Sequence, residues 1–348
     1  MDFIIDIIKA IIFGIVEGIT EWLPISSTGH MLILEEFFSL KETQGEDFFE
    51  FFLVIIQLAA ILAVVLHFFV DLWPFGKNKT QDEKKMIWSK WANILLASIP
   101  AAVFGILFDD WLDEHFHNFP TVATTLIIYG LAFIVIESLL VRKKYSAKKR
   151  YHLDAVSSTV NECHDPYCIF KTHHVEHITC SQAMIIGLAQ VLALIPGTSR
   201  SGVTICAALL LSIDRTTATE FSFYLSIPAM LGGSLIKTIS FVHKGNVLTG
   251  NQLAILGVAC LFAFIVSLLA INFLLRFLRS RTFISFGIYR IILGGILLIV
   301  YFAAIRNAGS ADVFIMHAND MAQTIAPSGK IQLPMVNHRF DNAFRIGL

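Results

Sequence analysis

Long apolar runs separated by short polar loops make up most of this chain. Six runs approach or exceed the roughly 20 residues that an α-helix needs to cross a bilayer. They cover residues 48–70, 91–108, 121–141, 218–240, 252–275 and 286–305. The pattern therefore predicts an all-α, polytopic membrane protein with six full transmembrane spans.

Two further apolar stretches are interrupted before they are long enough to cross. Residues 3–40 break at Pro24 and residues 181–213 break at Pro196, each beside a run of small polar residues. Short segments interrupted by glycine or proline at matching places in two halves are typical of a binding site between repeats. We therefore expect two re-entrant helical hairpins. Because irregular backbone at membrane depth is tolerated only where it lines a cavity, the two breaks should meet centrally.

The two halves of the chain also correspond in sequence. Four positions around the first break match positions 173 residues later: Gly14, Glu17, Ser26 and Gly29 correspond to Gly187, Gln190, Ser199 and Gly202. Each half holds one hairpin and three spans, and an odd number of spans inverts the second copy relative to the first. We expect a first repeat at 1–141, a cytoplasmic loop at 142–180, an inverted second repeat at 181–305 and an extracytoplasmic tail at 306–348.

Composition and charge agree with a membrane location. The chain is 55% hydrophobic and 15% charged, with a mean hydropathy of +0.69, whereas about a quarter of the residues of a soluble domain are charged. Lysine and arginine gather at 77–90, 142–171 and 276–281, and the positive-inside rule places these segments in the cytoplasm. The net charge of −1 and the lack of a basic stripe with interleaved aromatic residues give no indication of nucleic-acid binding.

The first break carries groups suited to acid–base chemistry. Glu17 and Glu21 are four residues apart, so they share one face of a helix among apolar neighbours. Such a pair needs a cation or a proton to offset the repulsion. Hydroxyl groups and an imidazole follow the break, at Ser26, Ser27, Thr28 and His30. The simpler interpretation, a capped helix end and a turn, leaves the glutamates unexplained.

The second break has the composition of a phosphate-binding loop. In PGTSRSG at 196–202 the glycines free backbone N–H groups, Ser199 and Ser201 supply hydroxyls, and a helix N-terminus follows. Arg200 offers a planar fork that matches phosphate oxygens, and an arginine inside a membrane is usually functional. The structural alternative is that Arg200 bonds carbonyl groups at the break or pairs with Glu17 or Glu21.

Two other charged residues lie within predicted spans. Glu137 and Arg290 are close to the cytoplasmic ends of their spans. For both we expect a structural role, with the Arg290 side chain reaching toward the membrane interface.

Together these stretches resemble one family, the undecaprenyl-diphosphate phosphatases of the bacitracin-resistance type. The resemblance rests on EGITEWLPISSTGH at 17–30, PGTSRSGVT at 196–204 and EFSFYLSIP at 220–228, and it covers about residues 1–141 and 180–305. It implies hydrolysis of undecaprenyl diphosphate to undecaprenyl phosphate, which recycles the lipid carrier for peptidoglycan synthesis and confers bacitracin resistance. It also implies an inverted repeat in the bacterial cell membrane, an active site that opens to the extracytoplasmic side, and dependence on Mg²⁺ or Ca²⁺.

The resemblance assigns roles to individual residues. The catalytic set is Glu17, Glu21, Ser27 and His30, and the diphosphate-binding set is Ser26, Thr28, Ser199, Arg200, Ser201 and Thr204. In our hypothesis Ser27 is the nucleophile and His30 its base, and Glu21, alone or with Glu17, binds the metal or orients the attacking group. A water nucleophile activated by His30 is the alternative, because it needs the same residue types.

A polyprenyl-phosphate transporter or flippase is the competing class, because inverted repeats with broken helices are also usual in transporters. Moving an anion does not need a Glu/Ser/His set, which favours the enzyme.

In the loop 142–180, Cys163, His164 and Cys168 with the histidines that follow could ligate zinc, although their spacing fits no standard zinc site. Assembly as a homodimer stays open.

Overall fold

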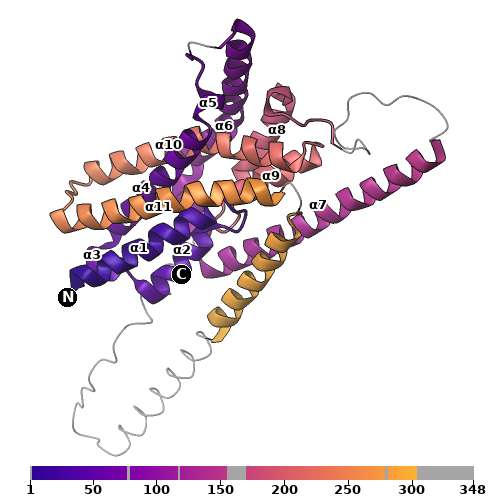
Figure 1. Cartoon of the computed structure of the whole chain (residues 1–348). Helices are drawn as coiled ribbons and strands as arrows, with labels where there is room; N and C mark the ends of the chain where they lie inside the picture. Colours follow the sequence, from indigo (N-terminus) through magenta and orange to yellow (C-terminus); the bar gives the residue numbers. More distant parts are fainter. Residues whose placement is uncertain (1, 77–78, 117, 155–169, 279–280, 304–348) are drawn as a thin grey trace, which may run out of the picture.

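The computed structural model describes residues 2–76, 79–116, 118–154, 170–278 and 281–303. Within these ranges the chain is helical and forms no β-strand (Figure 1). The first half contains α1 (Asp2–Thr20), α2 (Ser27–Phe38), α3 (Lys41–Gln44), α4 (Glu46–His67), α5 (Phe69–Leu72), α6 (Gln81–Phe116) and α7 (Phe119–Asp154). The second half contains the 3₁₀ turn η1 (Val175–His177), α8 (Cys180–Gln190), the 3₁₀ turn η2 (Val191–Leu194), α9 (Arg200–Leu210), α10 (Arg215–His243), α11 (Gly250–Leu278) and a final span at Ile284–Ala303.

The six predicted spans are confirmed. Helices long and apolar enough to cross a membrane lie at Glu46–His67, Gln81–Phe108, Phe119–Lys143, Arg215–His243, Gly250–Leu278 and Ile284–Ala303. Two of them extend beyond the apolar run: α6 begins at Gln81, and α7 continues to Asp154 into the segment expected to be a loop from residue 142. Apolar patterning ends where charged residues begin, but helical hydrogen bonding can continue past that point into water.

The short apolar stretches form the two hairpins, α1–α2 and α8–α9, but proline does not end their first helices. α1 ends at Thr20, four residues before Pro24, and α8 ends at Gln190, before η2 and Pro196. Both prolines therefore lie inside the turns, where the missing N–H and the fixed φ cost no helical hydrogen bond. The turns are consequently longer than the sequence pattern indicated, and each displays several side chains.

α2 and α9 begin in the same way. Ser26 caps α2 by accepting a hydrogen bond from the Gly29 N–H at 3.4 Å, and Ser199 caps α9 by accepting one from the Gly202 N–H at 3.2 Å. Both caps have a positive φ, 74° and 67°, which is uncommon for residues other than glycine. The two serines are the pair already related by the 173-residue offset, so this local geometry is compatible with an inverted repeat.

Each hairpin packs against a span of the other half through a glycine. Gly14 of α1 lies against Ala259 of α11, and Gly187 of α8 lies against Ala97 of α6. A Cβ at either glycine would overlap the carbonyl oxygen of the alanine. Absence of a side chain thus lets the helix backbones approach closely, which is the usual basis of helix association in membranes.

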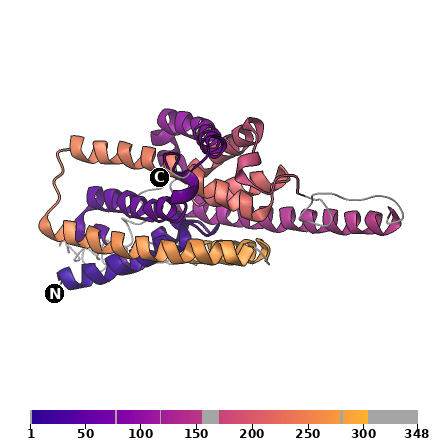
Figure 2. The ribbon, with the colours of Figure 1, turned by 45° about the horizontal axis from the view of Figure 1, so that its top comes forward.

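The open ends of the two hairpins lie at opposite ends of the bundle. Near the start of α1 and α4, the Asp47 carboxylate accepts a 2.6 Å bond from Lys244, and Gln252 donates to the Gln44 carbonyl. The second hairpin starts instead beside α6, where the Asn93 amide donates to the Ile178 carbonyl at 2.7 Å. Figures 1 and 2 show α1 and the α10–α11 connection together at the end of the molecule away from α8.

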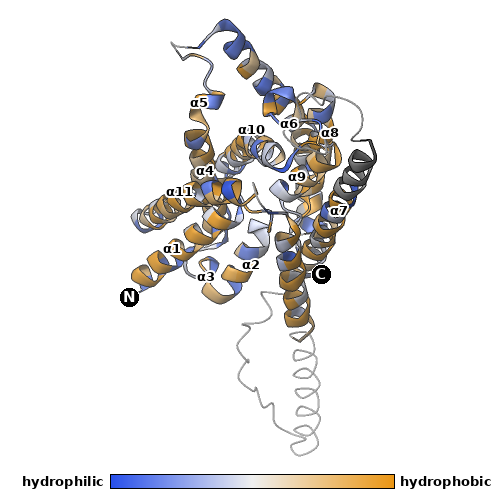
Figure 3. Ribbon diagram, turned by 45° about the vertical axis from the view of Figure 1, so that its right-hand side comes forward, coloured by the Kyte–Doolittle hydropathy of each residue, from blue (hydrophilic) through white to orange (hydrophobic). Residues whose placement is uncertain are grey.

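Polar residues gather where the two turns meet, inside an apolar shell. Figure 3 shows pale and blue segments of α2 and α9 in the centre, with mostly orange helices around them. Buried polar side chains near the turns include Glu17, Glu21, Ser26, Ser201 and Thr204. The fold therefore places the chemically active part of the chain in the interior of the bundle.

The close approach at Gly14 generates a prediction about stability. Gly14→Ala should lower the midpoint of thermal unfolding in detergent, because the added methyl group must displace the α11 backbone. The matched control is Gly257→Ala on α11, where a Cβ would meet nothing within 4 Å. Alanine is the better helix former by about 1 kcal/mol, so the control should unfold at the wild-type temperature or slightly above it. Equal midpoints for the two variants would contradict the packing described here.

Candidate active site

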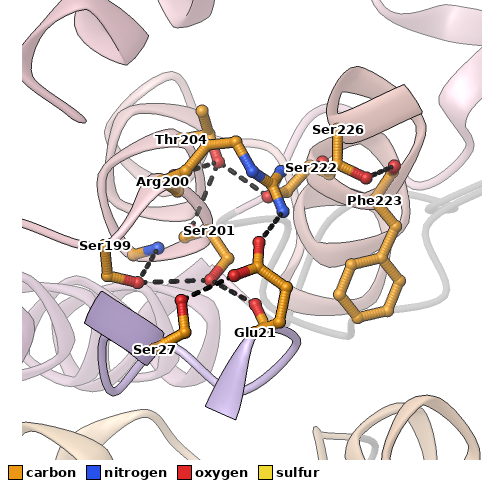
Figure 4. A network of polar contacts seen from close by, with 10 residues as sticks. Glu21, Ser27, Ser199, Arg200, Ser201, Thr204, Ser222, Phe223 and Ser226 are labelled. Carbon is orange, nitrogen blue, oxygen red and sulfur yellow. Dashed lines mark hydrogen bonds and ion pairs between the residues drawn. The ribbon is translucent and has the colours of Figure 1, made fainter. Parts of the chain in front are cut away.

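The two turns are joined by one carboxylate. Ser27 Oγ donates a 2.7 Å hydrogen bond to Glu21 Oε2, and Arg200 Nη2 donates a 3.1 Å bond to Glu21 Oε1 (Figure 4). Glu21 is 8% exposed, and the Arg200 side chain is 13% exposed, so this ion pair is largely shielded from solvent. Three residues that the sequence predicted as functional thus form one connected group.

Ser27 and Arg200 occupy equivalent places in the two hairpins. Ser27 is the first residue of α2, and Arg200 is the first residue of α9, each directly after a capping serine with positive φ. Their numbers differ by the same 173 that relates the caps. The two N-termini therefore bring a hydroxyl and a guanidinium to the same carboxylate, and each helix dipole favours a bound anion at that point.

The serine-rich loop around Arg200 is tied to the first turn. Ser201 Oγ lies 3.4 Å from the Glu21 carbonyl oxygen and 3.3 Å from Ser199 Oγ (Figure 4). Arg200 Nη1 donates to the Ser222 carbonyl of α10 at 2.9 Å, while its Nε has no hydrogen-bond partner. An unpartnered buried donor leaves the guanidinium able to bind a further acceptor.

Thr204 links the start of α9 to α10. Its Oγ1 lies 2.9 Å from the Arg200 carbonyl oxygen and 2.7 Å from Ser222 Oγ, and the residue is 1% exposed. The hydroxyl is therefore engaged inside the protein, whereas Thr28 on the first turn of α2 remains partly exposed. Ser222 belongs to the EFSFYLSIP stretch, where sequence reasoning assigned no individual role.

His30 is held away from Ser27. Its Nδ1 lies 2.7 Å from the Ser26 carbonyl oxygen, and its Nε2 lies 2.7 Å from the hydroxyl of Tyr289 in the final span. The expected Ser27–His30 pairing is thus replaced by a Ser27–Glu21 hydrogen bond. Tyr289 was not among the predicted site residues, because a tyrosine in an apolar span is common and carries no local motif.

The expectation that Arg290 reaches the membrane interface is wrong. Arg290 is 0% exposed and donates to the carbonyl oxygens of Pro24, Gly197 and Thr198 at 3.3, 3.0 and 2.9 Å. These carbonyls belong to both turns and have lost their helical partners, so a multivalent donor is needed at that depth. An arginine in an apolar span was the only indication in the sequence of this role. Because Arg290 lies close in sequence to a charged loop, we expected its side chain to reach the membrane interface instead.

Glu137 has the structural role expected of it. It is 0% exposed and accepts two hydrogen bonds from Arg215 at the start of α10, at 2.8 and 2.6 Å, and a third from the Phe283 N–H. This contact joins α7, α10 and the beginning of the final span. It lies outside the group of residues that surrounds Glu21.

The glutamate pair offers ligands for a divalent cation. Glu17 is 1% exposed, and its Oε1 has no hydrogen-bond partner, although it lies one helical turn from Glu21. Among the described residues no group of three or more His, Cys, Asp or Glu side chains forms a complete metal site. Mg²⁺ is commonly bound through one or two carboxylates together with the phosphates of a substrate. The residues present therefore fit a cation that binds with an anionic ligand.

The suggested zinc ligands are only partly within the described structure. Cys163, His164 and Cys168 lie outside the described residues. His173 is described, and its Nδ1 lies 3.6 Å from Asp214 Oδ2.

Comparisons with known proteins agree with the two motifs. The family model described as "Bacitracin resistance protein BacA" matches residues 10–296. Similar curated proteins named undecaprenyl-diphosphatase include one from Streptococcus mutans, 50% identical over 296 residues that cover 85% of this chain and 96% of the relative. Another, from Enterococcus faecalis, is 48% identical over 290 residues that cover 83% of this chain and 95% of the relative. This chain belongs to the BacA family of bacitracin resistance proteins.

Proposed function

We propose that this chain hydrolyses undecaprenyl diphosphate to undecaprenyl phosphate and inorganic phosphate. The observation that carries the proposal is the Ser27–Glu21–Arg200 group, which joins a hydroxyl, a carboxylate and a guanidinium across the two turns. Two relatives named undecaprenyl-diphosphatase match this chain over 95% and 96% of their own length, which supports the same activity. The reaction returns the lipid carrier to cell-wall synthesis and so accounts for bacitracin resistance.

Arg200 and the two helix N-termini bind the diphosphate. The free Nε–H of Arg200 and its partly exposed fork can donate hydrogen bonds to phosphate oxygens, and the dipoles of α2 and α9 add positive potential at the same place. Groups already held in place before the reaction stabilise the charge that develops on the phosphoryl oxygens. Glu17 and Glu21 would hold a divalent cation, which supplies further neutralisation of that charge.

Ser27 is positioned as the nucleophile. As Oγ bonds to the terminal phosphorus, its proton passes to Glu21 Oε2, the atom to which it already donates. The bond from phosphorus to the bridging oxygen breaks, and undecaprenyl phosphate leaves. Water then attacks the phosphoserine and gives one proton to His30. The bond between phosphorus and Ser27 Oγ breaks, phosphate departs, Ser27 Oγ takes back the proton held by Glu21, and His30 releases its proton to water. We assign the base of the first step to Glu21 and not to His30, because the Ser27 hydroxyl donates its hydrogen bond to Glu21.

The lipid tail of the substrate would lie on the apolar outside of the bundle. Beside Tyr289, the final span exposes Ile288 and Ile292, at 47% and 57% of their surfaces. An isoprenoid chain needs only such apolar contact, so the headgroup can enter the polar centre while the tail stays in lipid. This arrangement explains why the phosphatase is built inside a membrane.

The site would open to the extracytoplasmic side of the membrane. Lysine and arginine are concentrated in the α5–α6 and α7–α8 connections, which under the positive-inside rule supports a cytoplasmic location for both. The open end of the first hairpin lies at the opposite end of the bundle, beside the α10–α11 connection. The external diphosphate would therefore reach the Ser27 turn from outside.

The activity can be measured directly on the purified protein. Undecaprenyl diphosphate in detergent should release one phosphate per molecule, and EDTA should stop the release until Mg²⁺ or Ca²⁺ is added back. Undecaprenyl phosphate is the control substrate and should release none. Absence of phosphate release under all cation conditions would refute the proposed function.

The roles of Ser27 and Glu21 can be separated by titrating the cation. Ser27→Ala removes the nucleophile, so turnover should fall by at least about 10³-fold and stay low at every Mg²⁺ concentration. Glu21→Gln keeps the shape but loses a charged oxygen and the proton acceptor, so added Mg²⁺ should recover only part of its turnover. Retention of substantial activity by Ser27→Ala would show that water is the nucleophile.

Sidedness can be tested by labelling single cysteines in a variant that lacks the native ones. A cysteine at position 113, in the part of α6 that follows the apolar span, should react with an impermeant maleimide added to intact cells. A cysteine at position 148, in the basic C-terminal part of α7, should react only after the cells are permeabilised. The reverse pattern would place the Ser27 turn on the cytoplasmic side.

A further inference from the structure

Hydrogen bonding fixes which nitrogen of His30 carries the proton. Nδ1 lies 2.7 Å from the Ser26 carbonyl oxygen, which can only accept, so Nδ1 must be the donor. In the neutral ring Nε2 then presents a lone pair. The partner of Nε2 is the Tyr289 hydroxyl at 2.7 Å, which must therefore donate. The two rings are parallel, with centroids 5.8 Å apart.

Tyr289 is held in a fixed place relative to both turns. It precedes Arg290, whose guanidinium donates to Pro24 in the first turn and to Gly197 and Thr198 in the second. Any shift of the final span would break these bonds. His30 and Tyr289, 259 residues apart in sequence, are thus brought together by the same element that joins the hairpins.

Two charged residues near His30 have other hydrogen-bond partners, which leaves the Tyr289 hydroxyl to bond Nε2. The positive charge of Arg290 acts on the imidazole through space. Glu21, on the other side of the turn, is already bonded to Ser27 and Arg200. Tyr289 is 43% exposed, so its side chain has room to rotate about the fixed backbone and let a water molecule approach Nε2. The hydrogen bond from Nδ1 to the Ser26 carbonyl would keep the imidazole in place during that exchange.

We propose that Tyr289 is a positioning residue of the active site, which orients His30 with the hydrogen on Nδ1 and with Nε2 as the proton-accepting nitrogen. The inference rests on the proposed hydrolysis, in which His30 accepts a proton from the water that cleaves the phosphoserine. In the proposed hydrolysis Tyr289 itself forms and breaks no bond to phosphorus. Its contribution is the geometry and protonation state of the imidazole.

Tyr289→Phe keeps the ring stack and removes only the hydroxyl. Loss of one orienting hydrogen bond should lower kcat roughly tenfold and leave KM for undecaprenyl diphosphate unchanged. The acidic limb of the pH–rate profile should move to higher pH, because the neutral imidazole loses its hydrogen-bond donor and is protonated more readily. The midpoint of thermal unfolding should not change.

The matched control is Tyr301→Phe, which removes a tyrosine hydroxyl about 18 Å further along the same span. It should show wild-type kcat and pH dependence. In a His30→Ala background, Tyr289→Phe should cause no further loss, because an effect that acts through His30 disappears with it. An equal loss in both backgrounds, or an unchanged kcat and pH profile in Tyr289→Phe, would overturn the proposal.

A second readout does not depend on turnover. Diethyl pyrocarbonate modifies neutral imidazole, and peptide mass spectrometry locates the modified histidine. His30 should react faster in Tyr289→Phe than in the wild type, because Nε2 is no longer hydrogen bonded, and at the wild-type rate in Tyr301→Phe. An unchanged rate in Tyr289→Phe would overturn the positioning role, whereas a wild-type protein that releases no phosphate would refute the proposed hydrolysis.

Discussion

The structure depends on the need to satisfy backbone polar groups at membrane depth. Each hairpin breaks in the interior of the bundle, and each break leaves carbonyl oxygens without the helical donors they would otherwise have. Arg290 supplies donors to carbonyls of both turns at once, with no surface of its own exposed. One guanidinium therefore links two irregular turns in the interior of the bundle. The Ser27–Glu21–Arg200 group lies at the junction that results.

The matching backbones of the two hairpins carry different chemistry. The capping serines, Ser26 and Ser199, have similar strained dihedral angles, and the next residue in each case begins a helix. That next residue is Ser27 in one hairpin and Arg200 in the other, so equivalent positions supply a hydroxyl and a guanidinium to the same carboxylate. The glutamate that joins them has no counterpart in the second turn, because residue 194 is leucine. Similar backbone geometry with unlike side chains makes an asymmetric site from related halves.

Sequence patterning predicted the six spans and the two interrupted hairpins because a bilayer imposes a strong length requirement on apolar helices. It placed the breaks at Pro24 and Pro196, whereas the helices end earlier, since a proline inside a turn looks the same in sequence as one that ends a helix. The sequence revealed candidate site residues where several polar and ionisable side chains lie close together along the chain, as at 17–30 and 196–204. Tyr289, Arg290 and Ser222 were missed as site residues because their roles come from distant contacts, which no local spacing records.

The position of Arg290 has a consequence for how the protein is made. A membrane protein is inserted as it is synthesised, so the hairpin with Glu21 and the hairpin with Arg200 both enter the bilayer before the final span leaves the ribosome. Until that span arrives, the carbonyls of Pro24, Gly197 and Thr198 lack the donor that they have in the finished bundle. The nascent chain must therefore keep both turns near water, the translocation channel or each other. The last span begins more than 80 residues after the second turn, so the Ser27–Glu21–Arg200 group can reach its final surroundings only late in synthesis.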